Sequence, residues 1–276
     1  MKFTKMQGCG NDYVYVNCFT EKIENAPELA KRVSNRNFGI GSDGLILVCP
    51  SAVADVRMVM YNADGSQSQM CGNGIRCVGK FAYDYGLVNK ECITVETLAG
   101  IKTLQLQTEN GKVKTVTVDM GKPELEAKKI PVLSEKEQVI GEPVRVLGTE
   151  YTITCVSMGN PHAVTFVESV SAIEIEKVGP VFEHHPMFPE RVNTEFIELA
   201  GKDELKMRVW ERGSGETLAC GTGACASAYA AMLNGYTGQE VLVHLLGGDL
   251  QIRLDEETGH IFMTGPAVTV YEGEWL

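Results

Sequence analysis

Two short stretches of sequence decide the fold: residues 70–77 read MCGNGIRC, and residues 219–223 read ACGTG. In each stretch a cysteine is followed by Gly-x-Gly. The two cysteines, Cys71 and Cys220, lie 149 residues apart. A single motif of this length is weak evidence, so the question is whether the offset recurs elsewhere in the chain.

The same offset of 149 residues does recur. The pairs that keep it are Gly86 and Gly235, Gly10-Asn11 and Gly159-Asn160, and Asn62 and Glu211. Several matches at one offset without insertions predict an internal duplication and two similar domains. The second copy is expected from about residue 150 onward. Residues 120–150, which contain charges, Pro and Gly, are expected to bridge the copies.

Local patterns predict an α+β fold. Residues 56–61 (VRMVMY) and 205–210 (LKMRVW) alternate as half-buried strands do. Many other short strand-like runs follow, and their spacing favours curled antiparallel sheets over βαβ units. Residues 74–85 and 223–233 have the composition of helices that end at Gly86 and Gly235. Each cysteine should therefore lie just before, or in, the first turn of a largely buried helix.

Composition limits the classes of function. A net charge of −11 argues against nucleic acid and anionic membranes as partners. No apolar run approaches the ~20 residues of a membrane helix, and the N-terminus lacks the apolar core of a signal peptide. Nine cysteines without a secretory signal indicate reduced thiols in the cytoplasm rather than a disulfide framework.

A cysteine at a helix N-terminus is suited to proton transfer. Unpaired backbone N–H groups and the helix dipole favour a thiolate there, and thiol pKa values can fall from about 8.5 to roughly 3.5–7.5. The adjacent glycines let a carboxylate approach the backbone N–H groups. Two such termini facing each other would hold one carboxylate and place a sulfur on each side of its α-carbon. One thiolate would remove the α-proton while the opposed thiol donates another.

Two structural alternatives are weighed against this hypothesis. Both cysteines could be buried hydrophobic thiols, the usual role of an intracellular cysteine. The paired glycine context at repeat-related positions disfavours that interpretation. A metal site is disfavoured because the sequence has no CxxC pair or other ligand spacing typical of zinc.

The chain resembles the diaminopimelate epimerases, within a superfamily that includes proline racemase and the phenazine-biosynthesis isomerases. The resemblance spans nearly the whole chain and rests on eight motifs taken together. They are GNDY (10–13), FGIGSDG (38–44), NADGS (62–66), MCGNGIRC (70–77), GNPH (159–162), RVNTE (191–195), WERGSGET (210–217) and ACGTG (219–223).

The resemblance implies two pseudosymmetric domains, each a β-barrel-like, antiparallel-rich sheet around a central helix, with the substrate between them. Residues 1–119 together with a C-terminal return of residues 264–276 would form the half with Cys71. Residues 120–263 would form the half with Cys220. Family members interconvert LL- and meso-diaminopimelate in lysine and peptidoglycan synthesis, without pyridoxal phosphate and without metal. The resemblance also implies a homodimer.

The resemblance assigns roles residue by residue. Cys71 and Cys220 would be the acid/base pair, assisted by His162 and Glu211. The backbone N–H groups that would hold the reacting carboxylate belong to Gly72, Asn73, Gly221 and Thr222. The side chains that would contact the rest of the substrate are those of Asn11, Asn62, Asn160, Asn193, Glu211 and Arg212. Taken singly, the asparagines are more often turn residues, Arg212 could be a surface charge, and His162 could be structural.

Two other functions share features with this sequence. A proline racemase or hydroxyproline epimerase has the same architecture, but those enzymes tend to have histidine where this chain has Asn73. A redox-switched binding module that uses Cys71 and Cys220 as a dithiol belongs to a different class.

One departure from the family is Gly44, where some members carry glutamine, so Gly44 is left out of the predicted site.

Overall fold

The computed structural model describes residues 1–276 as four α-helices, one short 3-10 helix and eighteen strands. The chain divides into two compact units. Unit 1 is Met1–Asp119 with Thr264–Leu276, and unit 2 is Met120–Met263. The chain passes from one unit to the other within β8 (Lys112–Gly121) and again within β17 (Ile261–Pro266). None of the four α-helices is both long and apolar enough to cross a bilayer.

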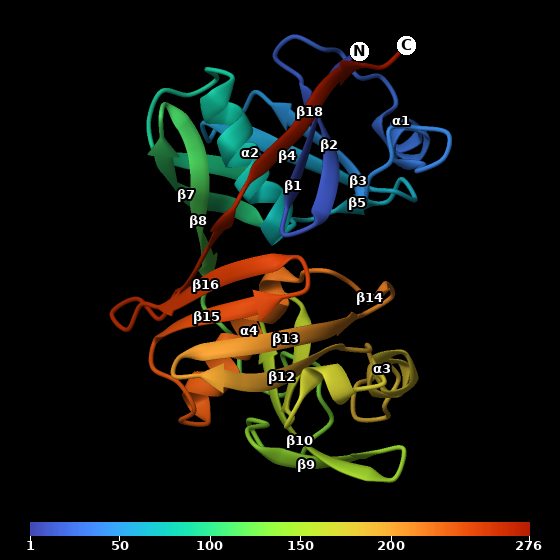
Figure 1. Ribbon diagram of the computed structural model, residues 1–276, viewed down its shortest axis with the longest axis vertical. Coiled ribbons are helices and arrows are strands. Elements are labelled where there is room, and N and C mark those ends of the chain that lie inside the picture. Colours follow the sequence, from blue (N-terminus) through green and yellow to red (C-terminus); the bar gives the residue numbers. More distant parts are fainter. The chain divides into compact units, whose positions relative to one another are not determined.

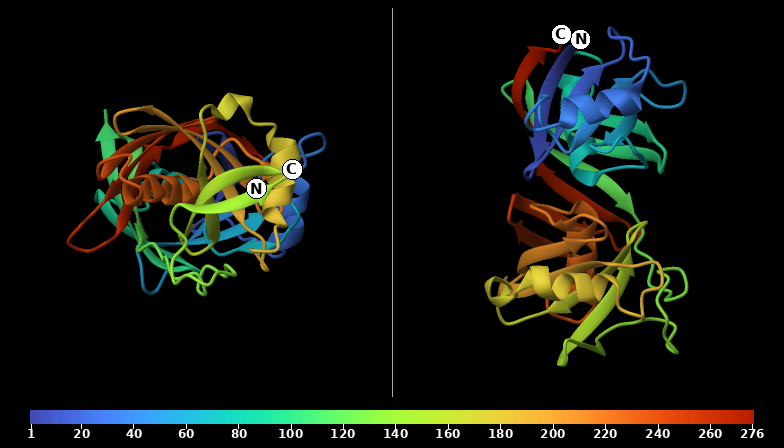
Figure 2. Two further views of the ribbon diagram at one scale, coloured as in Figure 1. Left: turned by 90° about the horizontal axis from the view of Figure 1, so that it is seen from below. Right: turned by 90° about the vertical axis from the view of Figure 1, so that its right-hand side faces the viewer.

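Unit 1 is a mixed sheet wrapped around α2 (Figure 1). Besides its parts of β8 and β17, unit 1 contains β1 (Lys2–Gly8), β2 (Asn11–Asn17), α1 (Ala26–Ser34), β3 (Gly44–Cys49), β4 (Val56–Asn62), β5 (Gln67–Ser68), α2 (Gly72–Asp84), β6 (Cys92–Thr97), β7 (Gly100–Glu109) and β18 (Val268–Glu274). The C-terminal strand β18 runs antiparallel to β1, so both chain ends lie side by side (Figures 1 and 2).

Unit 2 encloses α4 in the same way, as the left view of Figure 2 shows. Its elements are β9 (Glu142–Val146), β10 (Thr149–Ser157), β11 (Pro161–Phe166), the 3-10 turn η1 (Val170–Ala172), α3 (Ile175–Glu183), β12 (Asn193–Gly201), β13 (Glu204–Glu211), β14 (Gly215–Glu216), α4 (Gly221–Leu233), β15 (Glu240–Leu245) and β16 (Gly248–Leu254). α4 has small side chains on nearly every face, and nine of its residues are buried.

Strand pairing repeats the duplication seen in the sequence. In unit 1, β2 is parallel to β3, β3 antiparallel to β4, and β4 parallel to β6. In unit 2, β11, β12, β13 and β15 pair in that same order and sense. Even the register is kept, because Tyr13 pairs with Gly44 and His162 with Asn193, each residue 149 positions from its counterpart. The duplicated α+β architecture is therefore present at the level of individual residues.

The expectation of antiparallel sheets without βαβ units is wrong for four parallel strand pairs, two in each unit. In unit 1, β2 and β3 are joined through α1, and β4 and β6 through β5 and α2. In unit 2, β11 and β12 are joined through α3, and β13 and β15 through β14 and α4. Parallel neighbours require a crossover connection, which a helix commonly provides. α1 has local helix signals, an Asn25 cap, a proline in its first turn and basic residues in its last.

The interpretation of residues 120–150 as a bridge is also wrong. This segment belongs to unit 2, and its apolar side chains lie in the core of that unit. The buried ones include Ala127, Ile130, Val132, Val139, Val144 and Val146. The charged residues between these apolar positions are mostly exposed. Their number gives the segment a composition similar to that of a linker.

Candidate functional site

Both cysteines are the N-cap residues of their helices. Cys71 precedes α2 in an extended conformation, and its sulfur accepts a hydrogen bond from the Gly74 N–H at 3.3 Å. Cys220 precedes α4 in the same conformation and accepts from the Gly223 N–H at 3.4 Å. A side-chain acceptor at this position satisfies one of the amides that a helix start leaves unpaired. Each sulfur therefore lies at the positive end of a buried helix.

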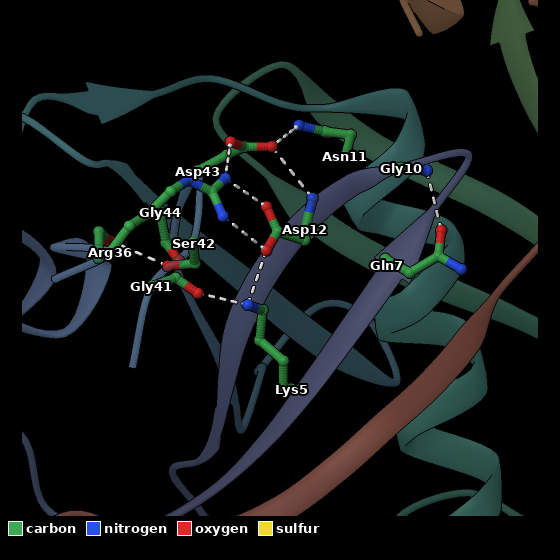
Figure 3. Close-up of polar contacts among 11 residues, drawn as sticks. Lys5, Gln7, Gly10, Asn11, Asp12, Arg36, Gly41, Ser42, Asp43 and Gly44 are labelled. Carbon is green, nitrogen blue, oxygen red and sulfur yellow. Dashed lines mark hydrogen bonds and ion pairs between the residues drawn. The ribbon is translucent and has the colours of Figure 1, made fainter. Parts of the chain in front are cut away.

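In unit 1 the sulfur of Cys71 contacts the amide of Asn11. Cys71 Sγ donates to Asn11 Oδ1 at 3.3 Å, and Asn11 Nδ2 donates to Asp43 Oδ2 at 2.7 Å. Asp43 also accepts from Arg36 at 2.8 Å (Figure 3). Because a carboxylate can only accept, Asp43 fixes the NH₂ end of the Asn11 amide and turns its oxygen toward the thiol.

A second carboxylate, Asp12, extends this network on β2. Lys5 Nζ lies 2.6 Å from Asp12 Oδ2, and Arg36 Nη2 lies 2.9 Å from Asp12 Oδ1 (Figure 3). Burial alone would raise the pKa of Asp12, but hydrogen bonds from Arg36 and Lys5 outweigh burial and lower it. Arg36 thus links Asp43 to Asp12 on β2, and Lys5 on β1 contacts both Asp12 and the Gly41 carbonyl of the loop that carries Asp43.

The first turn of α2 is held from beneath by Arg76, whose side chain is fully buried. Its guanidinium donates to Gly72 O at 3.2 Å, Asn73 Oδ1 at 3.0 Å and Pro266 O at 3.1 Å. The last of these acceptors belongs to the final residue of β17, in the C-terminal segment of unit 1. Arg76 was not singled out by the sequence analysis, although it lies inside the quoted motif CGNGIRC, because burial cannot be inferred from the motif.

Asn62 lies at the end of β4 and makes contacts typical of a turn residue. Its Nδ2 donates to Ser66 Oγ at 3.0 Å, and its backbone N–H donates to Ser66 O at 2.8 Å. Its predicted contact with a substrate stays a prediction.

In unit 2 the electrostatics of Cys220 differ from the expectation. Burial raises the pKa of Cys220 well above its ordinary value, and the charges of Glu211 and Glu195 raise it further. Hydrogen bonds from Thr222 and the Gly223 amide oppose this effect but do not reverse it. The expectation of a lowered thiol pKa is therefore wrong for Cys220, since burial and two carboxylates outweigh the helix terminus. Cys220 is a protonated thiol at neutral pH.

His162 and Asn160 form a buried group with Glu195. His162 Nδ1 lies 2.7 Å from Glu195 Oε1, and both side chains are fully buried. His162 Nε2 lies 3.0 Å from Asn160 Oδ1. The strands explain the contact, because β11 is parallel to β12 and His162 points to the same face as Glu195 two residues beyond its pair, Asn193. Glu195 was not among the predicted site residues.

Asn193, Arg212 and Glu211 gather where β12 begins and β13 ends. Asn193 Nδ2 donates to Pro161 O at 2.7 Å, and Asn193 Oδ1 accepts from the Arg212 N–H at 2.9 Å. The Arg212 guanidinium donates to Glu190 O at 3.0 Å. Glu211 accepts from Thr217 at 2.5 Å. The structure thus brings Asn193 and Arg212 into contact with each other, and it places Glu211 close enough to Cys220 for its charge to act on that thiol.

Gly44, the departure from the family, has no room for a side chain. It lies on β3 opposite Asn62 and beside Tyr13. A β-carbon there would lie 2.2 Å from the carbonyl oxygen of Tyr61 and 2.9 Å from the Tyr13 ring. Real β-carbons essentially never approach a backbone atom this closely.

We therefore expect Gly44→Ala to lower the free energy of unfolding by about 1–3 kcal/mol, the usual cost of overpacking. Thermal unfolding followed by circular dichroism measures this change. Gly201→Ala is the control, since a β-carbon there meets only a Glu204 side chain at ordinary contact distance. Equal melting temperatures for both variants would show that β3 and β4 separate without cost.

Comparison with known proteins identifies the family. The family model described as diaminopimelate epimerase matches residues 3–126 and 154–270. The chain belongs to the diaminopimelate epimerase family. A diaminopimelate epimerase of Acetivibrio thermocellus is 59% identical over 274 residues, covering 99% of this chain and 98% of that protein. One from Methanococcus maripaludis is 60% identical, covering 99% of each chain.

Solved structures share the fold at low sequence identity. A Bacillus anthracis phenazine biosynthesis protein of the PhzF family superposes with a TM-score of 0.74 at 19% identity, covering 100% of this chain and 99% of that chain. A hydroxyproline epimerase from Agrobacterium vitis gives a TM-score of 0.68 at 15% identity, covering 99% and 90%. At these identities the likeness shows the fold alone. The predicted α+β fold of this superfamily is confirmed.

Proposed function

We propose that this protein interconverts LL- and meso-diaminopimelate, with Cys71 and Cys220 as the acid/base pair. The observation that carries the proposal is the repeated N-cap cysteine, each sulfur at the start of a buried helix, in a chain of this family. The relatives that are 59% and 60% identical over nearly the whole chain bear that enzyme's name.

The proposed reaction inverts one α-carbon in two proton transfers. The backbone amides of Gly72, Asn73, Gly221 and Thr222 would hold the reacting carboxylate. As the α-proton leaves, negative charge spreads onto that carboxylate, and donors already oriented by the two helix starts stabilise it. One cysteine accepts the proton as a thiolate while the other donates its own from the opposite face.

The raised pKa of Cys220 supports a division of roles in the free enzyme. Because Cys220 is protonated, it supplies the proton donor, and Cys71 is then the partner that must lose its proton before accepting the α-hydrogen. In the reverse reaction the roles exchange, as microscopic reversibility requires. Glu211 and His162, close to this end of α4, are proposed to assist the exchange.

The far amino acid head of the substrate would be bound by a guanidinium and several amides. Arg212 uses one of its N–H donors for Glu190 O, which leaves further donors for a carboxylate. Asn11, Asn62, Asn160 and Asn193 are proposed to complete this contact set. A head that is bound but never deprotonated explains why one centre inverts and the other does not. Operation in lysine and peptidoglycan synthesis, in the cytoplasm and as a homodimer, belongs to the same proposal.

Solvent deuterium incorporation tests the proposal directly. In D₂O, purified protein with LL-diaminopimelate should introduce deuterium at one α-carbon per molecule and produce the meso isomer, without added pyridoxal phosphate or metal. Mass spectrometry and chiral chromatography measure both outcomes. Proline is run in parallel and should remain unlabelled. Labelling of proline at a comparable rate would overturn the substrate, and loss of turnover after dialysis against chelator would overturn the cofactor-free reaction.

A further inference from the structure

The residues that pack against the first turns of the two central helices occupy equivalent positions but differ in charge. Beneath α2, a β-carbon on Gly74 would lie 2.8 Å from Ile46 Cδ1. Beneath α4, a β-carbon on Gly223 would lie 2.6 Å from Glu195 Oε1. Positions 46 and 195 are 149 residues apart, the offset that relates the two cysteines. Glu195 therefore occupies the place of an isoleucine.

A second pair of residues follows the same rule. His162 in unit 2 lies 149 residues after Tyr13 in unit 1. The phenol and isoleucine of unit 1 are thus replaced in unit 2 by an imidazole and a carboxylate in contact at 2.7 Å. A buried carboxylate is unfavourable unless it is paired, and His162 provides a partner for one of the two Glu195 oxygens. Glu195 Oε2 has no hydrogen-bond partner in the fold.

We propose that Glu195 is a positioning residue that makes the two cysteines unequal, by fixing the His162 ring and by placing a buried negative charge behind Cys220. The proposal deepens the proposed function and rests on it. Glu195 does not touch the substrate. It acts through its two neighbours, and unit 1 has no counterpart because Ile46 is apolar.

The groups around Cys220 favour this interpretation. Its negative neighbours are Glu211 on β13 and Glu195 on β12, and the charges of both raise the pKa of Cys220. The groups that oppose them, the Thr222 hydroxyl and the Gly223 amide, belong to the first turn of α4. His162 on β11 contributes its ring, oriented by the hydrogen bond to Glu195. Removing the charge at position 195 should therefore make Cys220 easier to ionise.

The test is the pH dependence of Cys220 alkylation in the full-length protein without substrate. Wild-type protein and Glu195→Gln are treated with iodoacetamide across a pH series, and each cysteine peptide is quantified by mass spectrometry. We expect the midpoint for Cys220 to fall by about one pH unit in Glu195→Gln, which is about tenfold more thiolate at a fixed pH below the midpoint. The midpoint for Cys71, measured in the same samples, should not move.

The matched control is Ile46→Val, which alters the equivalent layer in unit 1 without changing charge. It should leave the Cys220 midpoint unchanged. If Glu195→Gln does not fold, the double variant His162→Tyr with Glu195→Ile copies the unit 1 arrangement into unit 2 and should also lower the midpoint. An unchanged Cys220 midpoint in a folded variant overturns the proposal.

A purely structural role for Glu195 would lower the melting temperature without moving the Cys220 midpoint, so both are measured. The alkylation assay needs no turnover. A protein that fails to epimerise diaminopimelate but shows the shifted midpoint would refute the proposed function and leave the role of Glu195 standing. With active protein, the pH profile of kcat/KM should shift in the same direction.

Discussion

Replacing either Cys71 or Cys220 by alanine is expected to reduce kcat/KM for diaminopimelate by about 100- to 10,000-fold, the usual contribution of a positioned acid or base. Inversion needs a proton taken from one face and another delivered to the opposite face, so neither cysteine can replace the other. Both directions must fall by the same factor, because the ratio of the two kcat/KM values equals the equilibrium constant. Measuring each direction by chiral chromatography checks the prediction.

The chain offers matched controls for this experiment. Cys77 and Cys225 lie within α2 and α4, each within six residues of a proposed catalytic cysteine, and both are fully buried. Cys77→Ala and Cys225→Ala remove a sulfur from the same helix without removing the capping thiol, and they should keep activity within a few-fold. Near wild-type activity in Cys71→Ala or Cys220→Ala would remove that residue from the mechanism.

The two central helices and their capping cysteines could be predicted from the sequence because each copy of the duplicated motif supports the interpretation of the other. Several matches at one offset are not expected by chance. The strand register keeps the same offset, since Tyr13 pairs with Gly44 and His162 pairs with Asn193. Extending the comparison to every position would also have shown that Ile46 corresponds to Glu195, a buried charge in one copy only.

Other features depend on tertiary contacts that no local pattern contains. Burial, Glu211 and Glu195 together raise the pKa of Cys220. The two glutamates precede Cys220 by 9 and 25 residues in the sequence, and strand pairing brings them close to it. An argument from the helix terminus alone gave the wrong direction. The parallel strands β2 and β3 were missed because period-2 alternation does not report the direction of a neighbouring strand.

Replacing Arg76 by methionine is expected to lower the free energy of unfolding of unit 1 by about 3–5 kcal/mol. Methionine fills most of the volume but removes the buried hydrogen bonds that the guanidinium donates to Gly72 O, Asn73 Oδ1 and Pro266 O. A hydrogen bond from a charged donor contributes about 1.5–3 kcal/mol.

The acceptors of Arg76 belong to the first turn of α2 and to the C-terminal return segment. Loss of the Arg76 hydrogen bonds is therefore also expected to destabilise the start of the helix that Cys71 caps. Calorimetry should show the melting temperature of unit 1 reduced by roughly 10 °C, at about 2–4 °C per kcal/mol for a chain of this size. The exposed Arg57 on β4 of the same unit is the control, and Arg57→Met should change stability by no more than about 0.5 kcal/mol. If Arg76→Met and the wild type have the same melting temperature, the guanidinium does not stabilise the first turn of α2. The amides proposed to bind the carboxylate must then be ordered by Cys71 and the helix itself.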